Sequence, residues 1–223
     1  MTLLKLKNIS KAYKDRESSL KVLSDVDLEL NNSEICIVMG PSGSGKTTLL
    51  NIAATLDVPD EGSVIINNKE LDCRDQKQVD SIRSEFLGVL FQANNLLPEF
   101  TIKENIEMPY KLLGVEEHLD SDMLLESFDL QAKKESFPDE LSAGELQRIS
   151  LLRACVNKPK MIIADEPTAN LDKDNLFLII DFIKKINKDY DTGFLIATHD
   201  ERLCDIADKI LYLDNCKLLK RDS

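Results

Sequence analysis

A glycine-rich loop that follows a short apolar run constrains this chain more than any other part of its sequence. Residues 40–47 read Gly-Pro-Ser-Gly-Ser-Gly-Lys-Thr and fit the pattern G-x-x-x-x-G-K-[ST]. In this pattern the glycines let backbone N–H groups turn inward around a phosphate. The lysine supplies charge for the terminal phosphates, and the last hydroxyl can ligate Mg²⁺. The sequence therefore predicts a strand, a phosphate-binding loop and a helix whose dipole strengthens the anion site.

Most of the candidate nucleotide-binding residues lie in or beside this loop. They are Gly40, Pro41, Ser42, Gly43, Ser44, Gly45, Lys46, Thr47 and Thr48. Lys46 is also a candidate catalytic residue, because its charge meets the phosphates that react. Thr47 is a candidate Mg²⁺ ligand.

Three short apolar runs, at 35–39, 161–164 and 194–197, are each followed by a polar turn. Strands buried on both faces have this character, and they occur in parallel sheets covered by helices. By contrast, Val26, Leu28 and Leu30 alternate with acidic residues, which predicts a half-buried and antiparallel strand. The chain therefore has the pattern of an α/β protein with an antiparallel part near its N-terminus.

The remaining patterns complete this organisation. Apolar residues from 176 to 186 fall on one helical stripe, and residues 210–219 have the pattern of a hairpin. The stretch 94–158 lacks strand-like runs and is rich in Leu, Glu and Lys, which predicts a helical insertion. We expect one nucleotide-binding domain over 1–223, with 1–93 and 159–223 in the α/β core and 94–158 in the helical subdomain.

A pair of acids ends the second apolar run. We expect Asp165 to lie at the carboxyl end of a strand beside the phosphate-loop strand, where it can hold Mg²⁺ through water. Glu166 is one residue further, so its side chain points elsewhere, toward an attacking water. A solvated acidic loop end is the simpler interpretation, but it does not account for the phosphate loop in the same chain.

The segment from Ser142 to Glu145 has the S-x-x-E spacing of a capping box, followed by helical apolar periodicity. A helix N-terminus with a hydroxyl and a close-approach glycine, Gly144, suits a γ-phosphate. Taken alone, such a box is usually a cap and nothing more. A nucleotide held between two copies of the protein would use both this end and the phosphate loop.

Composition limits the partners. The chain has 223 residues, 28 Lys+Arg and 40 Asp+Glu, giving a net charge of −12. This balance argues against coating nucleic acid or anionic lipid. The five cysteines show no CxxC spacing, which fits a reducing compartment, and no stretch approaches the roughly 20 apolar residues that span a bilayer. We expect a cytoplasmic protein without direct membrane insertion, held at the membrane through a partner.

An ordered set of motifs resembles the ATP-binding subunit of ABC transporters, and the match covers essentially the whole chain. The motifs are Tyr13, the loop 40–48, Gln92, the signature segment 141–145 with Pro138, Gln147 and Arg148, the segments 165–168 and 169–172, and His199 within 197–200. The resemblance implies a P-loop NTPase (RecA-like) core with a mostly parallel sheet. It also implies an N-terminal antiparallel β-subdomain and an inserted α-helical subdomain.

The resemblance also implies a mechanism. ATP and Mg²⁺ would be the cofactors, and two chains would form a head-to-tail homodimer with ATP between one loop and the partner's Ser142, Gly144 and Glu145. Tyr13 would stack on adenine, Glu166 would be the catalytic base, and His199 would contact the γ-phosphate. Gln92 would sense Mg²⁺ and water. An integral membrane subunit at the cytoplasmic face of the inner membrane would be driven by closure on ATP.

The subfamily is a finer question. Residues 95–101, with 104–106 and 108–109, resemble the lipoprotein-release branch, whose neighbours power macrolide or peptide exporters and cell division. Leu96, Leu97 and Phe100 lie where the family docks its membrane partner, or they belong to the core of the helical insertion. Ala143 replaces the usual first signature glycine, but Gly144 remains.

Two alternative functions are a soluble ABC ATPase of DNA repair or translation and a regulatory clamp with little turnover. The acidic charge and the single cassette disfavour the soluble ATPase. The presence of Glu166 and His199 disfavours the clamp.

Overall fold

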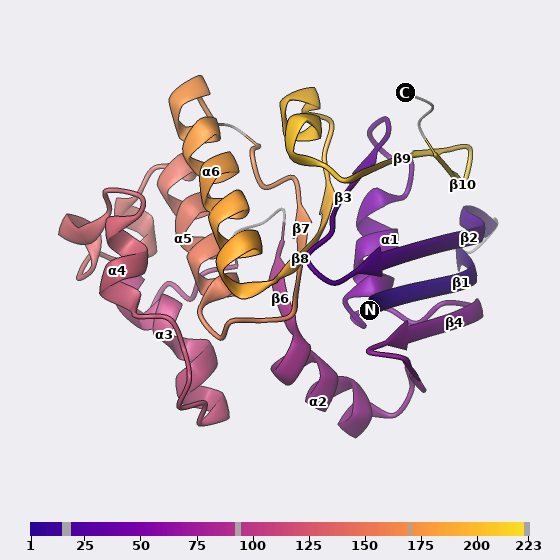
Figure 1. Cartoon of the computed structure of the whole chain (residues 1–223), viewed down its shortest axis with the longest axis horizontal. Helices are drawn as coiled ribbons and strands as arrows, with labels where there is room; N and C mark the ends of the chain where they lie inside the picture. Colours follow the sequence, from indigo (N-terminus) through magenta and orange to yellow (C-terminus); the bar gives the residue numbers. More distant parts are fainter. Residues whose placement is uncertain (15–18, 92–94, 170, 221–223) are drawn as a thin grey trace.

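A computed structural model describes residues 1–14, 19–91, 95–169 and 171–220. Its central layer is a six-stranded sheet (Figure 1). The order of its strands is β10 (Lys217–Lys220), β9 (Lys209–Asp214), β3 (Ile35–Met39), β8 (Gly193–Ala197), β7 (Met161–Asp165) and β6 (Leu87–Leu90). The pairs from β9 to β6 are parallel, and β10 returns antiparallel along β9. The three predicted buried strands and the C-terminal hairpin are confirmed.

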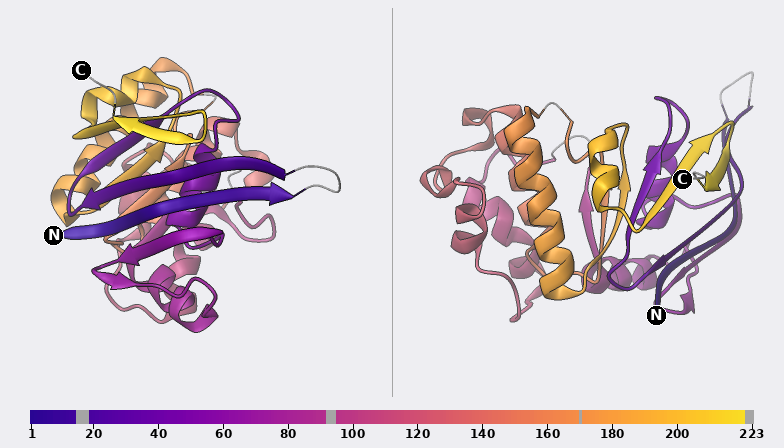
Figure 2. Two further views of the ribbon diagram at one scale, coloured as in Figure 1. Left: turned by 90° about the vertical axis from the view of Figure 1, so that its right-hand side faces the viewer. Right: turned by 45° about the horizontal axis from the view of Figure 1, so that its top comes forward.

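A second, antiparallel sheet lies beyond α1 (Lys46–Ala53) and covers it on the side away from the central sheet (Figure 2). Its strand order is β2 (Ser19–Asn31), β1 (Thr2–Lys14), β4 (Glu61–Ile66) and β5 (Lys69–Glu70). Val26, Leu28 and Leu30 are buried on the inner face of β2, as their alternation predicts. Helix α1 is therefore held between two sheets, which fixes the loop that precedes it.

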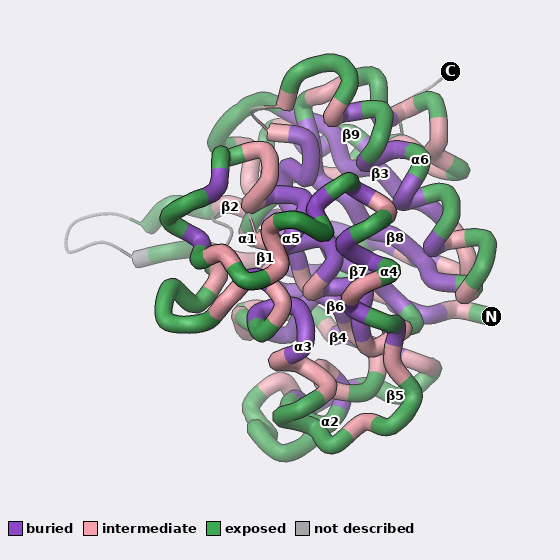
Figure 3. The backbone as a smooth tube through the Cα atoms, turned by 90° about the vertical axis from the view of Figure 1, so that its left-hand side faces the viewer, coloured by how far each residue is buried: buried purple, intermediate pink, exposed green. Residues whose placement is uncertain are grey.

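The opposite face of the central sheet is covered by α6 (Lys173–Tyr190) and α5 (Ala143–Cys155) (Figure 1). Alternate residues of β3 pack on opposite faces of the central sheet. Ile35 and Ile37 pack on the α5 and α6 side, while Cys36 and Val38 pack on the α1 side. Complete burial of each such aliphatic side chain stabilises the fold by about 1.5–3 kcal/mol. The buried strands contrast with exposed helix ends and loops in Figure 3.

Between β6 and β7 the described residues form helices and no strand. These helices are α3 (Ile102–Leu113), α4 (Ser121–Glu126), the 3-10 turns η1 (Gln131–Lys133) and η2 (Pro138–Glu140), and α5. The predicted inserted helical subdomain is therefore present, while its limits at 94 and 158 stay a prediction. Two further elements, α2 (Gln76–Phe86) and η3 (Glu201–Ile206), complete the chain. No helix of the described segments is long and apolar enough to cross a bilayer.

One expectation about the sheet is wrong. Strand β7, which carries Asp165, does not lie beside β3, because β8 runs between them and pairs with both. The apolar runs of β7 and β8 are alike in length and burial, so nothing in their sequences distinguishes a neighbour of β3 from the next strand out. The α1 helix nevertheless brings the phosphate loop back across β8 to Asp165.

Candidate nucleotide-binding site

The phosphate loop leaves β3 and enters α1 through Gly45, whose backbone is left-handed with a φ of 105°. A Cβ at this position would lie 2.7 Å from Cγ1 of Val22 on the antiparallel sheet. Glycine is thus required for both conformation and space. Gly45 provides no side-chain cap for α1, so the first N–H groups of the helix face the cavity without a capping acceptor.

A cavity of about 320 Å³ opens over this helix end and is lined by Ser42, Gly43, Gly45, Lys46, Thr47, Thr48, Asp165 and Glu166, with Val22 at its side. The Lys46 ammonium is buried and donates to the carbonyl oxygens of Gly40 and Pro41, at 2.8 and 3.0 Å. The Ser44 hydroxyl is buried and has no hydrogen-bond partner among the described residues. A buried unpaired hydroxyl in such a loop fits a phosphate oxygen.

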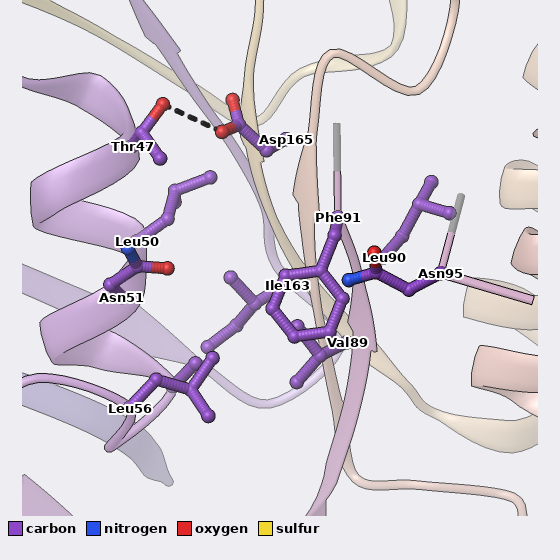
Figure 4. Close-up of a pocket in the computed structure, with 11 residues that line it drawn as sticks. Thr47, Leu50, Asn51, Leu56, Val89, Leu90, Phe91, Asn95, Ile163 and Asp165 are labelled. Atoms are coloured by element: carbon purple, nitrogen blue, oxygen red, sulfur yellow. Dashed lines mark hydrogen bonds between the residues drawn. The ribbon is translucent and has the colours of Figure 1, made fainter. Parts of the chain in front are cut away.

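Two of the candidate Mg²⁺ ligands, Thr47 and Asp165, lie next to each other. The Thr47 hydroxyl donates to Oδ2 of Asp165 at 2.7 Å, across the gap seen in Figure 4. Burial raises the pKa of Asp165, and the neighbouring Glu166 charge adds to this effect. A hydroxyl and a carboxylate side by side are the oxygen donors that Mg²⁺ prefers, so the residues present fit this cation.

Glu166 turns away from Asp165, as expected from its position one residue on. Its backbone is left-handed, with a φ of 50°, and its carboxylate lies against the end of β8. Oε2 accepts from the Thr198 hydroxyl at 3.1 Å, and Oε1 lies 2.9 Å from Nδ1 of His199. Since a carboxylate only accepts, this contact requires a proton on Nδ1. The Glu166 carboxylate is therefore aimed by two residues, while the His199 side chain is 74% exposed.

Tyr13 lies near Thr48 of α1 and near Asp57, which follows this helix. Its hydroxyl donates to Oδ2 of Asp57 at 2.8 Å and is 3.4 Å from the Thr48 hydroxyl. The Lys11 ammonium is 5.3 Å from the centre of the ring. Partial burial raises the pKa of Tyr13, and the Asp57 carboxylate adds to it. The ring is exposed and fixed by its hydroxyl, which suits a stacking platform.

The signature segment forms the predicted N-terminus of α5. Ser142 is the cap: its hydroxyl accepts from the Glu145 N–H at 3.3 Å and donates to the Glu145 carboxylate at 2.7 Å. The Ser142 backbone N–H, and then its hydroxyl, hold the pKa of Glu145 below its usual value. Gly144 lies near Leu171, whose Cδ2 would be 3.1 Å from an added Cβ. None of the described residues lining the 320 Å³ cavity belongs to α5, so the two predicted phosphate-facing ends are separate within one chain.

A second cavity, of about 430 Å³, lies between α1 and the strands β6 and β7 (Figure 4). Leu50 and Leu56 line it from the α1 side, and Val89 and Phe91 from the β6 side. Thr47 and Asp165 line both this cavity and the first one. The apolar cavity therefore adjoins the predicted magnesium ligands.

The stretch 95–101 next to this cavity is held in place by Asn105 of α3, which is fully buried. Its Oδ1 accepts from the Leu97 N–H at 2.7 Å, and its Nδ2 lies 3.0 Å from the carbonyl oxygens of Leu97, Phe100 and Thr101. Leu97 and Phe100 are 40% and 37% exposed, whereas Leu96 packs against the core. Leu96 is therefore half-buried against the core, while Leu97 and Phe100 are exposed, and docking at these side chains stays a prediction.

Two predicted residues, Gln92 and Asn170, lie outside the described residues. The sequence assigned no role to four residues that contact the site or the 95–101 stretch: Thr198, Asn105, Gln147 and Arg153. The first three lie within or beside segments that carry the family resemblance, whereas Arg153 does not. Thr198 could have been found as the polar residue that directly ends an apolar run. Asn105 could have been found as an amide on the buried stripe of a helix. The contacts of Gln147 and Arg153 have no comparable sequence signal, because their partners are backbone carbonyls remote in sequence.

Comparisons with known proteins agree with this geometry. Residues 23–169 match the protein family described as ABC transporter. The chain is 36% identical to the lipoprotein-releasing system ATP-binding protein LolD of Buchnera aphidicola, over 99% of this chain and 98% of the relative. It is 40% identical to the LolD protein of Pseudoalteromonas translucida, over 97% of this chain and 94% of the relative.

Solved structures match as well. A dimeric, post-hydrolysis structure of the ATP-binding cassette MJ0796, bound to ADP and Pi, superposes with a TM-score of 0.91 at 33% identity. That match covers 99% of this chain and 100% of the other. A second dimeric structure of MJ0796, described as a bacterial ABC transporter cassette, gives a TM-score of 0.89 at 33% identity. With the family match spanning most of the chain, and with the phosphate loop, acidic strand and capped signature helix in place, this chain belongs to the ABC transporter family of ATP-binding proteins.

Proposed function

We propose that this chain is the ATP-hydrolysing motor subunit of an ABC transporter complex that releases lipoproteins from the inner membrane. The observation that carries the ATPase part is the 2.7 Å contact between Thr47 and Asp165, beside the carboxylate of Glu166. It brings a phosphate loop, a magnesium-type donor pair and a candidate base to one cavity. The lipoprotein part rests on the relatives named LolD.

In this proposal the loop binds the phosphates of ATP. Lys46 exchanges the carbonyls of Gly40 and Pro41 for the terminal phosphate oxygens, while the N–H groups of α1 surround them. The Tyr13 ring, which is exposed, stacks on adenine. Thr47 and Asp165 would hold Mg²⁺, which neutralises phosphate charge when bound; Gln92 is a further candidate ligand.

Hydrolysis then needs an oriented water. Glu166 accepts a proton from that water as its oxygen bonds to the γ-phosphorus and the bond to ADP breaks. Thr198 and His199 hold the Glu166 carboxylate in position. Because Nδ1 of His199 bonds Glu166 and the side chain is largely exposed, the other ring nitrogen, Nε2, is available to contact the γ-phosphate.

A second copy of the chain completes each site. The capped N-terminus of α5 is exposed and lies outside the cavity of its own chain, so it is available to the ATP of a partner copy. The MJ0796 cassette is dimeric in its solved structures, which supports this arrangement. Ser142, Gly144 and Glu145 would then face the γ-phosphate across the dimer.

The membrane subunit would dock on the apolar surface formed by Leu97 and Phe100 beside the 430 Å³ cavity. Exposed large apolar side chains next to an apolar hollow are typical of an interaction site. We expect the chain to stay on the cytoplasmic face through this contact alone.

The ATPase proposal is tested with Glu166→Gln. Replacing a general base lowers turnover by roughly 10²–10⁴, while the loop still binds ATP. We expect the variant to accumulate as an ATP-bound dimer in light scattering. A variant that stays monomeric with ATP and hydrolyses it normally would show that the assigned mechanism is wrong.

The docking proposal is tested with Phe100→Glu, using Leu112→Glu as the control. Leu112 is an exposed apolar residue at the end of α3. When the tagged chain is purified from membranes, we expect Phe100→Glu to lose its membrane subunits and Leu112→Glu to keep them. Equal retention by both variants would contradict docking at this surface.

A further inference from the structure

Helix α5 holds the main chain at two places that matter for the proposed function. Near its start, Nε2 of Gln147 donates to the carbonyl oxygen of Glu166 at 3.3 Å. Near its end, Nη1 of Arg153 donates to the carbonyl oxygen of Asn95 at 2.8 Å. One contact reaches the candidate catalytic residue, and the other reaches the stretch that carries Leu97 and Phe100.

The part of α5 between these two contacts is packed into the core. Ile149, Leu151 and Leu152 are fully buried, and the Gln147 amide is 4% exposed. The two contacting residues are six apart, or about 9 Å along the helix axis. Because one packed helix carries both, a displacement at either end moves the other.

The contact at Glu166 acts on an unusual backbone. The left-handed φ of 50° at this residue is uncommon for anything but glycine, and its surroundings must hold it. The Glu166 carbonyl accepts from the Ala169 N–H at 3.1 Å and from Gln147. Moving Gln147 therefore changes the direction in which the Glu166 carboxylate leaves the chain.

The contact at Asn95 acts on a stretch whose other end is held by Asn105 and by the Thr101–Glu104 capping box. Asn105 of α3 holds residues 97, 100 and 101, and Arg153 of α5 holds residue 95. Burial lowers the pKa of Arg153, although a guanidinium remains charged in proteins. The 95–101 stretch is thus tied to both helices.

We propose that Gln147 and Arg153 are positioning residues, through which α5 links the placement of the 95–101 stretch to the placement of Glu166. The inference rests on the proposed function, since it takes Glu166 as the base and this stretch as the docking surface. Linkage is reciprocal, so nucleotide at the catalytic end must also alter the 95–101 stretch.

The test uses hydrogen–deuterium exchange of the Glu166→Gln chain, with and without ATP and Mg²⁺. We expect ATP to slow exchange in the phosphate loop and to alter exchange in residues 95–104. Arg153→Met keeps the aliphatic stem but removes the hydrogen-bond donor. It should reduce the ATP-dependent change in exchange of residues 95–104 about fivefold or more. Arg153→Lys, which keeps a donor, should retain most of it.

Asn187→Ala is the matched control. The Asn187 amide of α6 also holds two backbone carbonyls, those of Ser33 and Thr192, at 2.8 and 2.9 Å. Its loss should lower stability but leave the response of residues 95–104 intact. A full response in Arg153→Met, an equal loss in Asn187→Ala, or no response in the parent would overturn the inference. Missing protection of the phosphate loop would contradict the proposed nucleotide site itself and remove the basis of the inference.

A second variant tests the contact between Gln147 and the Glu166 carbonyl. Gln147→Leu, with Glu166 intact, should lower kcat about fivefold with an unchanged KM for ATP, because it redirects the base without touching the loop. A matching rise in KM, or an unchanged kcat, would contradict the positioning role of Gln147.

Discussion

Two helix N-termini in this molecule are proposed to meet the same kind of ligand, yet they are built in opposite ways. Helix α1 begins at Gly45, which has no side chain and leaves the first N–H groups without a cap. Helix α5 begins at Ser142 with a closed capping box between Ser142 and Glu145. Lys46 at the first end is buried, whereas Ser142 at the second end is exposed.

This difference in capping indicates how each helix end would contact phosphate. The α1 end has an open row of donors and a buried Lys46 that rests on loop carbonyls, so phosphate supplies the acceptors that the protein leaves out. At the α5 end the capping box already supplies acceptors for the Ser142 and Glu145 N–H groups. We therefore expect substitutions at the α1 end to change the nucleotide affinity of a single chain, and those at the N-terminus of α5 to change nucleotide contacts only between chains.

The largest expected effect comes from Lys46→Ala. Removing this charge should lower kcat by roughly 100-fold or more, as for other preorganised groups at a site of developing charge. Lys69→Ala, at an exposed lysine on β5, should leave the ATPase rate unchanged. Steady-state ATPase assays compare the two, and an equal rate in both variants would refute the special role of the α1 end.

Intermediate effects are expected on stability, where alanine substitutions at Gly45 and Gly144 should differ. Gly45→Ala forces a side chain into left-handed backbone against Val22, which costs about 1–3 kcal/mol from the conformation alone. Gly144→Ala lies in a helix and meets only Cδ2 of Leu171, so the gain in helix propensity, about 0.5–1 kcal/mol, offsets the contact.

Urea unfolding of the free chains measures both changes. We expect the free energy of unfolding to fall clearly for Gly45→Ala and to stay near that of the parent for Gly144→Ala. Equal losses would mean that the two helix ends tolerate a side chain alike, contrary to their geometry.

The sequence predicted the α1 end better than its surroundings. The 40–47 motif and the apolar run before it required no tertiary information, and Thr47 lies against Asp165 as expected. The order of β8 and β7 was not predictable, because both are short apolar runs and pairing is decided by helix packing. The contacts of Gln147 and Arg153 were not predicted for a related reason: each side chain bonds to a backbone carbonyl, which any residue supplies.

The smallest expected effect comes from Ser142→Ala, which should cost about 1 kcal/mol through loss of the cap. The Glu145 pKa is below its ordinary value in the folded chain, so ionised Glu145 stabilises the fold at neutral pH. That contribution disappears as pH falls through the folded pKa of Glu145.

Thermal or urea unfolding at several pH values tests this. The stability gap between parent and Ser142→Ala should be full near neutral pH and should narrow in acid. A gap that widens in acid would show that the capping box does not act through ionised Glu145.

The most direct test of the account asks whether the α5 end acts on the ATP of another chain. In the Glu166→Gln background, Ser142→Arg should abolish the ATP-dependent dimer seen by light scattering. Its monomer should still bind a fluorescent ATP analogue with the affinity of the parent, because α5 lies outside the cavity of its own chain. A dimer that persists, or a monomer affinity that falls together with the dimer, would contradict the shared site.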